Sequence, residues 1–158
     1  MSLWPKEAIL QTAQVNLHVT LFFLGFIQEE QIGEVCVKVG EACKDTEAFE
    51  LQFTGMKLME SEEAPKMIWL VGEPNDDLRL FLEKIEKIFS AFVREKKIYR
   101  PHVTMAKIKK SKWLKLEKKP LLKENLSLIE SVDSIAVFES LTLDGKRRYE
   151  PIDTFSLL

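Results

Sequence analysis

The first half of the chain alternates between continuous apolar runs and apolar residues at helical spacing. Residues 15–24 form an apolar run that ends at Gly25, which predicts a buried strand. Residues 28–45 predict a helix, and residues 50–59 and 66–71 predict two further strands. The helix prediction depends on apolar residues at helical spacing, namely Ile32, Val35, Val39 and Ala42.

The middle of the chain predicts a second helix, a strand and a loop. Asn75 precedes two aspartates, as an N-cap residue does, and opens a helix whose apolar face extends to Phe92. Residues 102–108 predict a strand. Residues 109–124 are rich in lysine and interrupted by Pro120, which predicts a loop with a short helical piece.

The last part of the chain predicts a hairpin. Two strands, residues 132–141 and 149–157, flank the turn pair Asp144-Gly145. Strands that follow one another, with two well-separated helices, favour an α+β fold with antiparallel pairing. No low-complexity linker divides the sequence, so residues 1–158 are expected to form one domain.

Composition narrows the class of protein. Hydrophobic residues make up 46% of the chain and charged residues 30%, which is typical of a globular protein. No apolar run reaches the length of a membrane helix, so no membrane association is expected. Cys36 and Cys43 lie seven positions apart in the first predicted helix, too far for a disulfide, and predict reduced thiols in a cytoplasmic protein.

Charge is distributed unevenly along the chain. Between Arg94 and Lys123 there are twelve Lys and Arg residues against two acidic residues, although the whole chain has a net charge of −2. A basic block on a mildly acidic protein fits an anionic ligand that binds on one side. A solvated, lysine-rich loop explains the same pattern, and charge alone does not separate the two interpretations.

The two histidines of the chain occur in matching sequences, each His-Val-Thr followed by an apolar residue. His18 and Thr20 form the first motif, and His102 and Thr104 form the second. Side chains two positions apart on a strand share a face, so each motif presents an imidazole beside a hydroxyl. A single histidine on an apolar strand is usually structural, but the repeated pair favours a functional site. The repetition also indicates two similar lobes that face each other.

Two imidazoles and two hydroxyls suit the hydrolysis of a phosphodiester. One histidine can take a proton from water while the other donates a proton to the leaving oxygen. Thr20 and Thr104 can donate hydrogen bonds to the non-bridging phosphate oxygens. This chemistry needs no metal or other cofactor, and no carboxylate or cysteine cluster accompanies the histidines in the sequence.

Both motifs resemble the paired His-x-Thr signatures of the two-histidine phosphoesterase superfamily. Residues 16–25, Asn-Leu-His-Val-Thr-Leu-Phe-Phe-Leu-Gly, are similar to the first motif of the RNA 2′,3′-cyclic phosphodiesterases, also called 2′-5′ RNA ligases or LigT-like proteins. Residues 100–107, Arg-Pro-His-Val-Thr-Met-Ala-Lys, resemble the second motif. Residues 138–150 resemble the closing hairpin of the same family.

The resemblance implies a bilobal α+β fold, with two antiparallel sheets facing a central cleft, helices on the outside and one His-x-Thr motif in each lobe. It implies hydrolysis of an RNA-terminal 2′,3′-cyclic phosphate to a 2′-phosphate, with reversible 2′-5′ RNA ligation in some members. The implied partners are RNA 3′ ends or small 2′,3′-cyclic nucleotides. The usual assignment in the family makes His18 the general acid and His102 the general base, an order that the motifs themselves leave open.

The chain departs from the family pattern at two places. The family commonly has an arginine five positions after the second histidine, near the phosphate. Lys107 stands there and keeps the charge without the bidentate fork, or it is an ordinary solvent-side lysine. The family also has a strand and a helix before the first motif. Here both are expected to be absent or shortened, with at most one turn of helix after Pro5.

The remaining candidates are weaker. Arg100 and the lysines of residues 107–119 could bind RNA phosphates. Tyr99 and Trp113 could stack on a base, although packing inside the protein is the favoured role for both. Two alternatives to the enzyme stay open: a nucleotide- or RNA-end-binding module of the same fold with weak or lost catalysis, and an unrelated α+β protein with coincidental motifs.

Overall fold

A computed structural model describes residues 4–92 and 99–158 of the chain. The chain divides into two compact units, and each unit contains segments from distant parts of the sequence. The first unit comprises Met1–Thr20, Gln52–Glu73 and Arg100–Ile129. The second unit comprises Leu21–Leu51, Pro74–Tyr99 and Glu130–Leu158.

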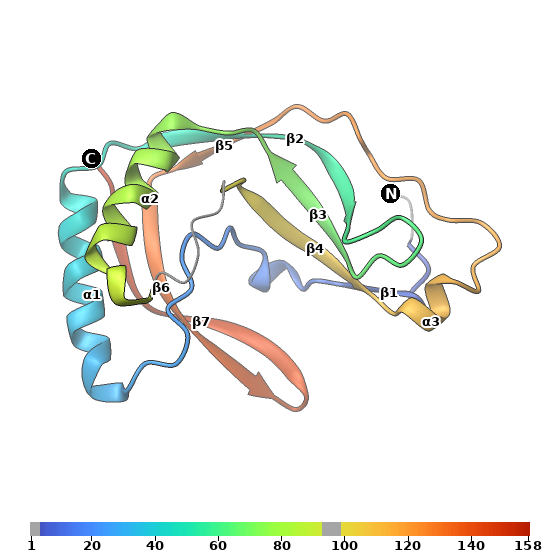
Figure 1. The fold of residues 1–158 in the computed structure, drawn as a ribbon, viewed down its shortest axis with the longest axis horizontal. Helices are drawn as coiled ribbons and strands as arrows, with labels where there is room; N and C mark the ends of the chain where they lie inside the picture. Colours follow the sequence, from blue (N-terminus) through green and yellow to red (C-terminus); the bar gives the residue numbers. More distant parts are fainter. Residues whose placement is uncertain (1–3, 93–98) are drawn as a thin grey trace. The chain divides into compact units, whose positions relative to one another are not determined.

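The larger sheet has five strands in the order β1-β4-β3-β2-β5 (Figure 1). Its strands are β1 (Ile9–Gln11), β2 (Phe49–Met59), β3 (Met67–Gly72), β4 (His102–Ile108) and β5 (Leu128–Val132). β1 pairs with β4, β4 with β3, and β3 with β2, each time antiparallel. β4 therefore lies inside the sheet, with hydrogen-bonded neighbours along both of its edges.

One face of this sheet is covered by the core of the first unit. Ile68 of β3 and Ala106 of β4 are fully buried, and they contact Trp113, which is 1% exposed. Trp113 ends α3 (Lys110–Trp113), the short helix after β4. Lys119 closes the following loop, because its ammonium donates to the Trp113 carbonyl and lies 5.1 Å from the centre of the indole ring.

Two helices and a hairpin form the second unit. The helix α1 (Glu29–Lys44) contacts α2 (Asp76–Ile88) and both strands of the hairpin, β6 (Ser134–Leu143) and β7 (Lys146–Ser156). The buried residues of this core come from the two helices and the residue after α2, and are Val35, Val39, Ala42, Cys43, Phe81, Ile85 and Phe89. The apolar spacing that predicted the helices is thus the spacing of their buried faces.

Most predicted elements are confirmed. The two helices, the strands β2, β3 and β4, and the hairpin occupy the predicted segments within a few residues. Asn75 caps α2, since its side-chain oxygen accepts a hydrogen bond from the Leu78 backbone at 2.8 Å. Asp144 and Gly145 have φ values of 50° and 70°, the left-handed conformations that a two-residue hairpin turn requires. The predicted α+β class with antiparallel pairing is correct.

The predicted strand over residues 15–24 is wrong. A 3-10 helix occupies Gln14–Asn16, and a single isolated bridge at Val19 is the strand-like pairing that follows. The apolar run has a different cause, because Leu21, Phe22 and their apolar neighbours pack against the core of the second unit. The strand that opens the sheet is instead β1, a few residues earlier, where at most a turn of helix was expected.

The expectation of one motif in each lobe stays a prediction. His18 and His102 both belong to the first unit. The reason is the bridge between Val19 and Val103, which joins the first motif to the strand that carries the second. The expected cleft between two facing sheets stays a prediction.

Two further properties of the fold are the length of its helices and the state of its two cysteines. Of the helices in the described ranges, none has the length and apolar character that crossing a membrane requires. Cys36 and Cys43 both lie on α1 as free thiols, in agreement with the predicted lack of a disulfide between them. Burial raises the pKa of both thiols above the ordinary value, which lowers the thiolate population and the reactivity of both.

Candidate active site

The two His-Val-Thr motifs lie side by side. Val19, at the centre of the first motif, forms an antiparallel bridge with Val103, at the centre of the second. In antiparallel pairing the flanking residues then lie opposite each other, so His18 faces Thr104 and the second histidine faces Thr20. Such cross-strand pairs have Cβ atoms about 5 Å apart. The bridge therefore gathers two imidazoles and two hydroxyls on one face of the sheet.

The registers of the neighbouring strands extend this face into three rows that cross the sheet from β2 through β3 and β4 to the N-terminal segment. The first row is Gly55, Val71, His102 and Thr20; the second is Lys57, Trp69, Thr104 and His18; the third is Met59, Met67, Lys107 and Leu10. We call these twelve residues the histidine face. Of the residues that alternate with them on β3 and β4, Ile68, Leu70 and Ala106 are at most 8% exposed and point into the core.

A β-bulge determines where Lys107 lies. The register of β4 against β3 shifts between Ile68 and Trp69, which leaves Met105 as an extra residue on β4. Five positions separate His102 from Lys107, an odd number that would put them on opposite faces of a regular strand. The extra residue brings Lys107 to the histidine face, one row beyond the motifs, with an exposed side chain.

Each histidine is oriented by the backbone carbonyl two residues before it. His18 Nδ1 lies 2.8 Å from the carbonyl oxygen of Asn16, and His102 Nδ1 lies 2.9 Å from that of Arg100. A carbonyl oxygen only accepts, so Nδ1 carries a proton in each ring. In both histidines Nε2 is therefore the nitrogen that can gain or lose a proton.

The predicted phosphate-binding residues differ in their surroundings. Thr20 Oγ1 lies 3.0 Å from His18 Nε2, and the hydroxyl donates to that nitrogen when the ring is neutral. Thr104 lies beside them on β4 and is partly exposed. Arg100 gives its carbonyl to His102, while its side chain is exposed. In the described parts of the chain, no three His, Cys, Asp or Glu side chains come together to hold a metal ion.

Trp69 is a residue of this face that sequence analysis missed. Its indole ring stacks on the imidazole of His102, with ring centres 3.7 Å apart and an interplanar angle of 16°. The indole Nε1 is buried and has no hydrogen-bond partner among the described residues. The alternating pattern of residues 66–71 put Trp69 on one face of a strand, but only the pairing of β3 with β4 brings that face to the histidines.

Replacing Trp69 with leucine is expected to lower kcat/KM for a 2′,3′-cyclic phosphate, the substrate that the resemblance of the two motifs implies, by about two- to tenfold, because stacked aromatic pairs contribute about 0.5–1.5 kcal/mol. Trp69→Phe keeps a ring beside His102 and should retain most of the activity. Steady-state kinetics over a range of pH values, at a temperature where both variants are folded, test this. Equal losses for both variants, with an unchanged pH profile, would show that Trp69 has only a packing role.

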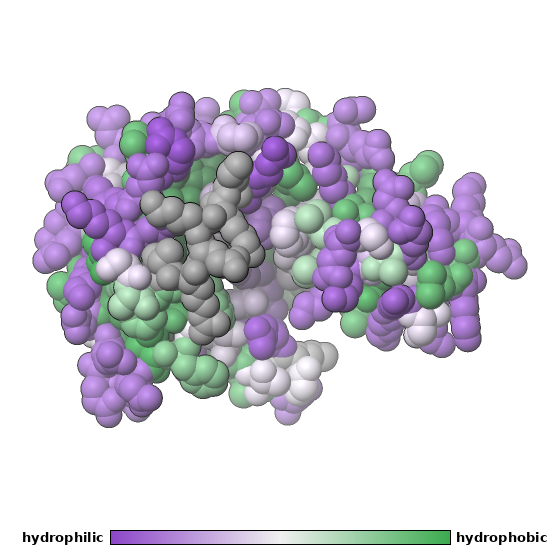
Figure 2. All heavy atoms as spheres, in the orientation of Figure 1, coloured by the Kyte–Doolittle hydropathy of each residue, from purple (hydrophilic) through white to green (hydrophobic). Residues whose placement is uncertain are grey.

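The uneven charge of the sequence coincides with the two units. The first unit has twelve Lys and Arg against seven acidic residues, and the second has eleven against eighteen. Hydrophilic side chains dominate the surface around α3 and the lysine-rich segment, with a few hydrophobic ones between them (Figure 2). The first unit, which holds both motifs, is therefore the basic one. Three residues of the predicted basic block, Arg94, Lys96 and Lys97, lie outside the described residues.

Burial favours a packing role for both aromatic candidates for base stacking. Trp113 is a core residue of the first unit, so the predicted packing role is confirmed. Burial raises the pKa of Tyr99 to about 12, which keeps the phenol neutral and agrees with packing inside the protein.

Comparison with known proteins places this geometry in a family. The model of the 2′-5′ RNA ligase superfamily matches residues 8–144. The chain belongs to this superfamily. It is 30% identical over 108 residues to the RNA 2′,3′-cyclic phosphodiesterase of Thermotoga maritima, and 32% identical over 99 residues to that of Aeropyrum pernix. These matches cover 66% and 60% of this chain but 57% and 54% of the relatives, so the chain spans little more than half of their length.

Among solved structures, this superfamily member is similar to E. coli LigT, with a TM-score of 0.76 and 20% sequence identity. The match covers 98% of this chain and 83% of LigT. LigT is also similar to it in crystal structures with 3′-AMP and with ATP. The likeness shows a LigT-like fold, and with the family match it confirms the resemblance predicted from the two motifs.

Proposed function

We propose that this superfamily member hydrolyses RNA-terminal 2′,3′-cyclic phosphates to 2′-phosphates, without a metal ion. The observation that carries the proposal is the Val19–Val103 bridge, which sets two carbonyl-oriented imidazoles on one face of a sheet. The activity for which the T. maritima and A. pernix relatives are named, RNA 2′,3′-cyclic phosphodiesterase, agrees with it. RNA 3′ ends and small 2′,3′-cyclic nucleotides are the substrates that follow.

The proposed reaction uses Nε2 of both histidines. His102 accepts a proton from water while the water oxygen attacks phosphorus. The bond from phosphorus to O3′ breaks, and His18, protonated at the start, donates its Nε2 proton to O3′. The phosphate stays on O2′, and solvent exchange restores the starting protonation states. An RNA 5′-hydroxyl in place of water would give a 2′-5′ linkage by the same steps, which accounts for ligation as a side activity.

The two histidines have different neighbours. The indole ring of Trp69 stacks on the imidazole of His102, with ring centres 3.7 Å apart. His18 has a different neighbour, the hydroxyl of Thr20 at 3.0 Å. The two motifs are identical in sequence, and these neighbours are what distinguishes their histidines.

The hydroxyls and the arginine complete the proposed site. Thr20 and Thr104 donate to the non-bridging oxygens, where they stabilise the charge that develops as water attacks. Thr20 exchanges its contact with His18 for the phosphate when substrate binds. Arg100 precedes His102 by two positions along the same backbone, and its exposed guanidinium contacts the phosphate or the RNA backbone beside it.

Hydrolysis of adenosine 2′,3′-cyclic phosphate in EDTA tests the proposal. We expect turnover with a bell-shaped dependence of kcat/KM on pH, because the reaction needs one histidine protonated and the other neutral. The product should be adenosine 2′-phosphate, separated from the 3′ isomer by chromatography. A 3′-phosphate product, or a rate that requires added metal, would contradict the mechanism. Tight binding of the nucleotide without turnover would favour the binding-module alternative.

A further inference from the structure

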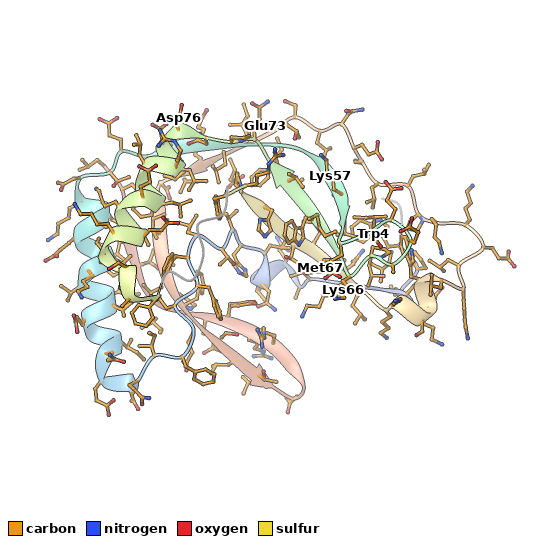
Figure 3. All side chains as sticks on the ribbon, viewed as in Figure 1. Trp4, Lys57, Lys66, Met67, Glu73 and Asp76 are labelled. Atoms are coloured by element: carbon orange, nitrogen blue, oxygen red, sulfur yellow. The ribbon has the colours of Figure 1, made fainter. Side chains whose placement is uncertain are left out.

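The third row of the histidine face has no part in the reaction described above. Leu10, Met59 and Met67 come from three different strands, and Lys107 lies among them on β4. Leu10 is 48% exposed, although it lies in a strand, and both methionines are partly exposed. Figure 3 labels Met67 at the start of β3 and Lys57 on the neighbouring strand β2. The row is therefore an apolar surface with one cation, directly beside the motifs.

The chemistry of this row fits a nucleotide. Flexible thioethers and an aliphatic side chain form an adaptable apolar surface for a base or a ribose. Lys107 supplies a point charge for a phosphate, and its ammonium has no ion-pair partner among the described residues. Met67 and Trp69 are two positions apart along β3, so the second and third rows are separated by about 7 Å. Lys107 is thus positioned beside the reacting phosphate rather than at it.

We propose that the third row is a subsite for the nucleotide that precedes the cyclic end, with Lys107 binding the phosphodiester that joins the two nucleotides. The inference rests on the proposed function and names its substrate class, an RNA end of two or more nucleotides. The hairpin turn beyond Met59 carries Glu60, which pairs with Lys66 at 2.8 Å, and further exposed glutamates. Glutamates are thus the charges nearest the β2 end of this row, while Lys57 belongs to the second row, so the phosphodiester of the third row lies at Lys107.

The test compares two substrates and two variants. The substrates are adenosine 2′,3′-cyclic phosphate and the dinucleotide ApA with a 2′,3′-cyclic phosphate end. We expect the wild-type chain to prefer the dinucleotide by about tenfold in kcat/KM, the effect of one charge-assisted contact. Lys107→Ala should remove most of this preference. Lys87→Ala removes the same charge from the exposed side of α2, outside the lysine-rich segment, and it should keep the preference.

The outcomes separate this inference from the proposed function. If Lys107→Ala lowers kcat/KM for both substrates by the same factor, Lys107 acts at the reacting phosphate and the subsite does not exist. A wild-type chain that turns over both substrates equally would also overturn the subsite alone. A wild-type chain that hydrolyses neither substrate would remove the proposed function, and the subsite with it.

Discussion

Replacing either His18 or His102 with alanine is expected to lower kcat for cyclic-phosphate hydrolysis by about 10²- to 10⁴-fold, the usual contribution of a general acid or base. Each substitution removes the imidazole whose Nε2 moves a proton in the proposed reaction. Nε2 is the reacting nitrogen because Nδ1 donates to the carbonyl of Asn16 in His18 and of Arg100 in His102. Because the two groups act in one step, the double variant should be little slower than the slower single variant. Single-turnover assays of all three variants measure this.

The control for this experiment is Gln11→Ala. Gln11 is exposed on β1 and pairs with Ala106, a residue that points away from the histidine face. The substitution changes the same edge of β4 without touching a motif, and the rate should stay within about twofold of the wild type, as for surface substitutions in general. Either histidine variant retaining a rate near that of Gln11→Ala, with an unchanged pH profile, would show that the proposed mechanism is wrong.

The second large effect is expected from Gly55→Ala, which should lower stability by about 1–3 kcal/mol or more. A Cβ at Gly55 would lie 2.2 Å from the carbonyl oxygen of Glu124 and 2.7 Å from its carbonyl carbon. The neighbouring backbone is hydrogen-bonded at this point, with Met56 N donating to Lys123 O at 2.7 Å. Leu126 N also donates to Thr54 O at 2.7 Å, so the backbone on both sides of Glu124 is tied to β2 and cannot move away freely. Urea unfolding followed by circular dichroism measures the loss.

Gly33→Ala is the matched control for Gly55→Ala. Gly33 lies in the middle of α1, and nothing lies within 4 Å of a Cβ built there. The substitution should therefore stabilise the chain by about 0.5–1 kcal/mol, because glycine in a helix costs more backbone entropy than alanine. Both variants replace a glycine with alanine, and they should shift the unfolding midpoint in opposite directions. Equal shifts would mean that the close approach at Gly55 does not exist in solution.

The elements that the sequence predicts well are those with a local cause. The cap at Asn75 and the turn at Asp144-Gly145 depend on a few adjacent residues, so the sequence contains their whole explanation. Residues 15–24 are different, because an apolar run indicates burial without saying whether the backbone pairs. The short strand β1 and the largely exposed strand β5 have no periodic pattern to find, since their partners lie far away in the sequence.

The same difference between local causes and distant pairings applies to the candidate site. The two His-Val-Thr motifs are visible in the sequence because each imidazole and its hydroxyl are two positions apart. That the two motifs act together was predicted from their repetition, but their direct pairing was not, since the bridge from Val19 to Val103 joins residues more than eighty positions apart. Trp69 was missed for the same reason, because its contact with His102 depends on the order of strands in the sheet.

The extra residue Met105 changes how intervals between functional residues should be compared among relatives. The five positions from His102 to Lys107 include one that β3 does not match. A relative without the bulge would hold its cation at the same place with an interval of four. An alignment would pair these two equivalent residues only if it placed a gap at the bulge. Conversely, a relative with an interval of five would need the same extra residue to bring its cation to the histidine face.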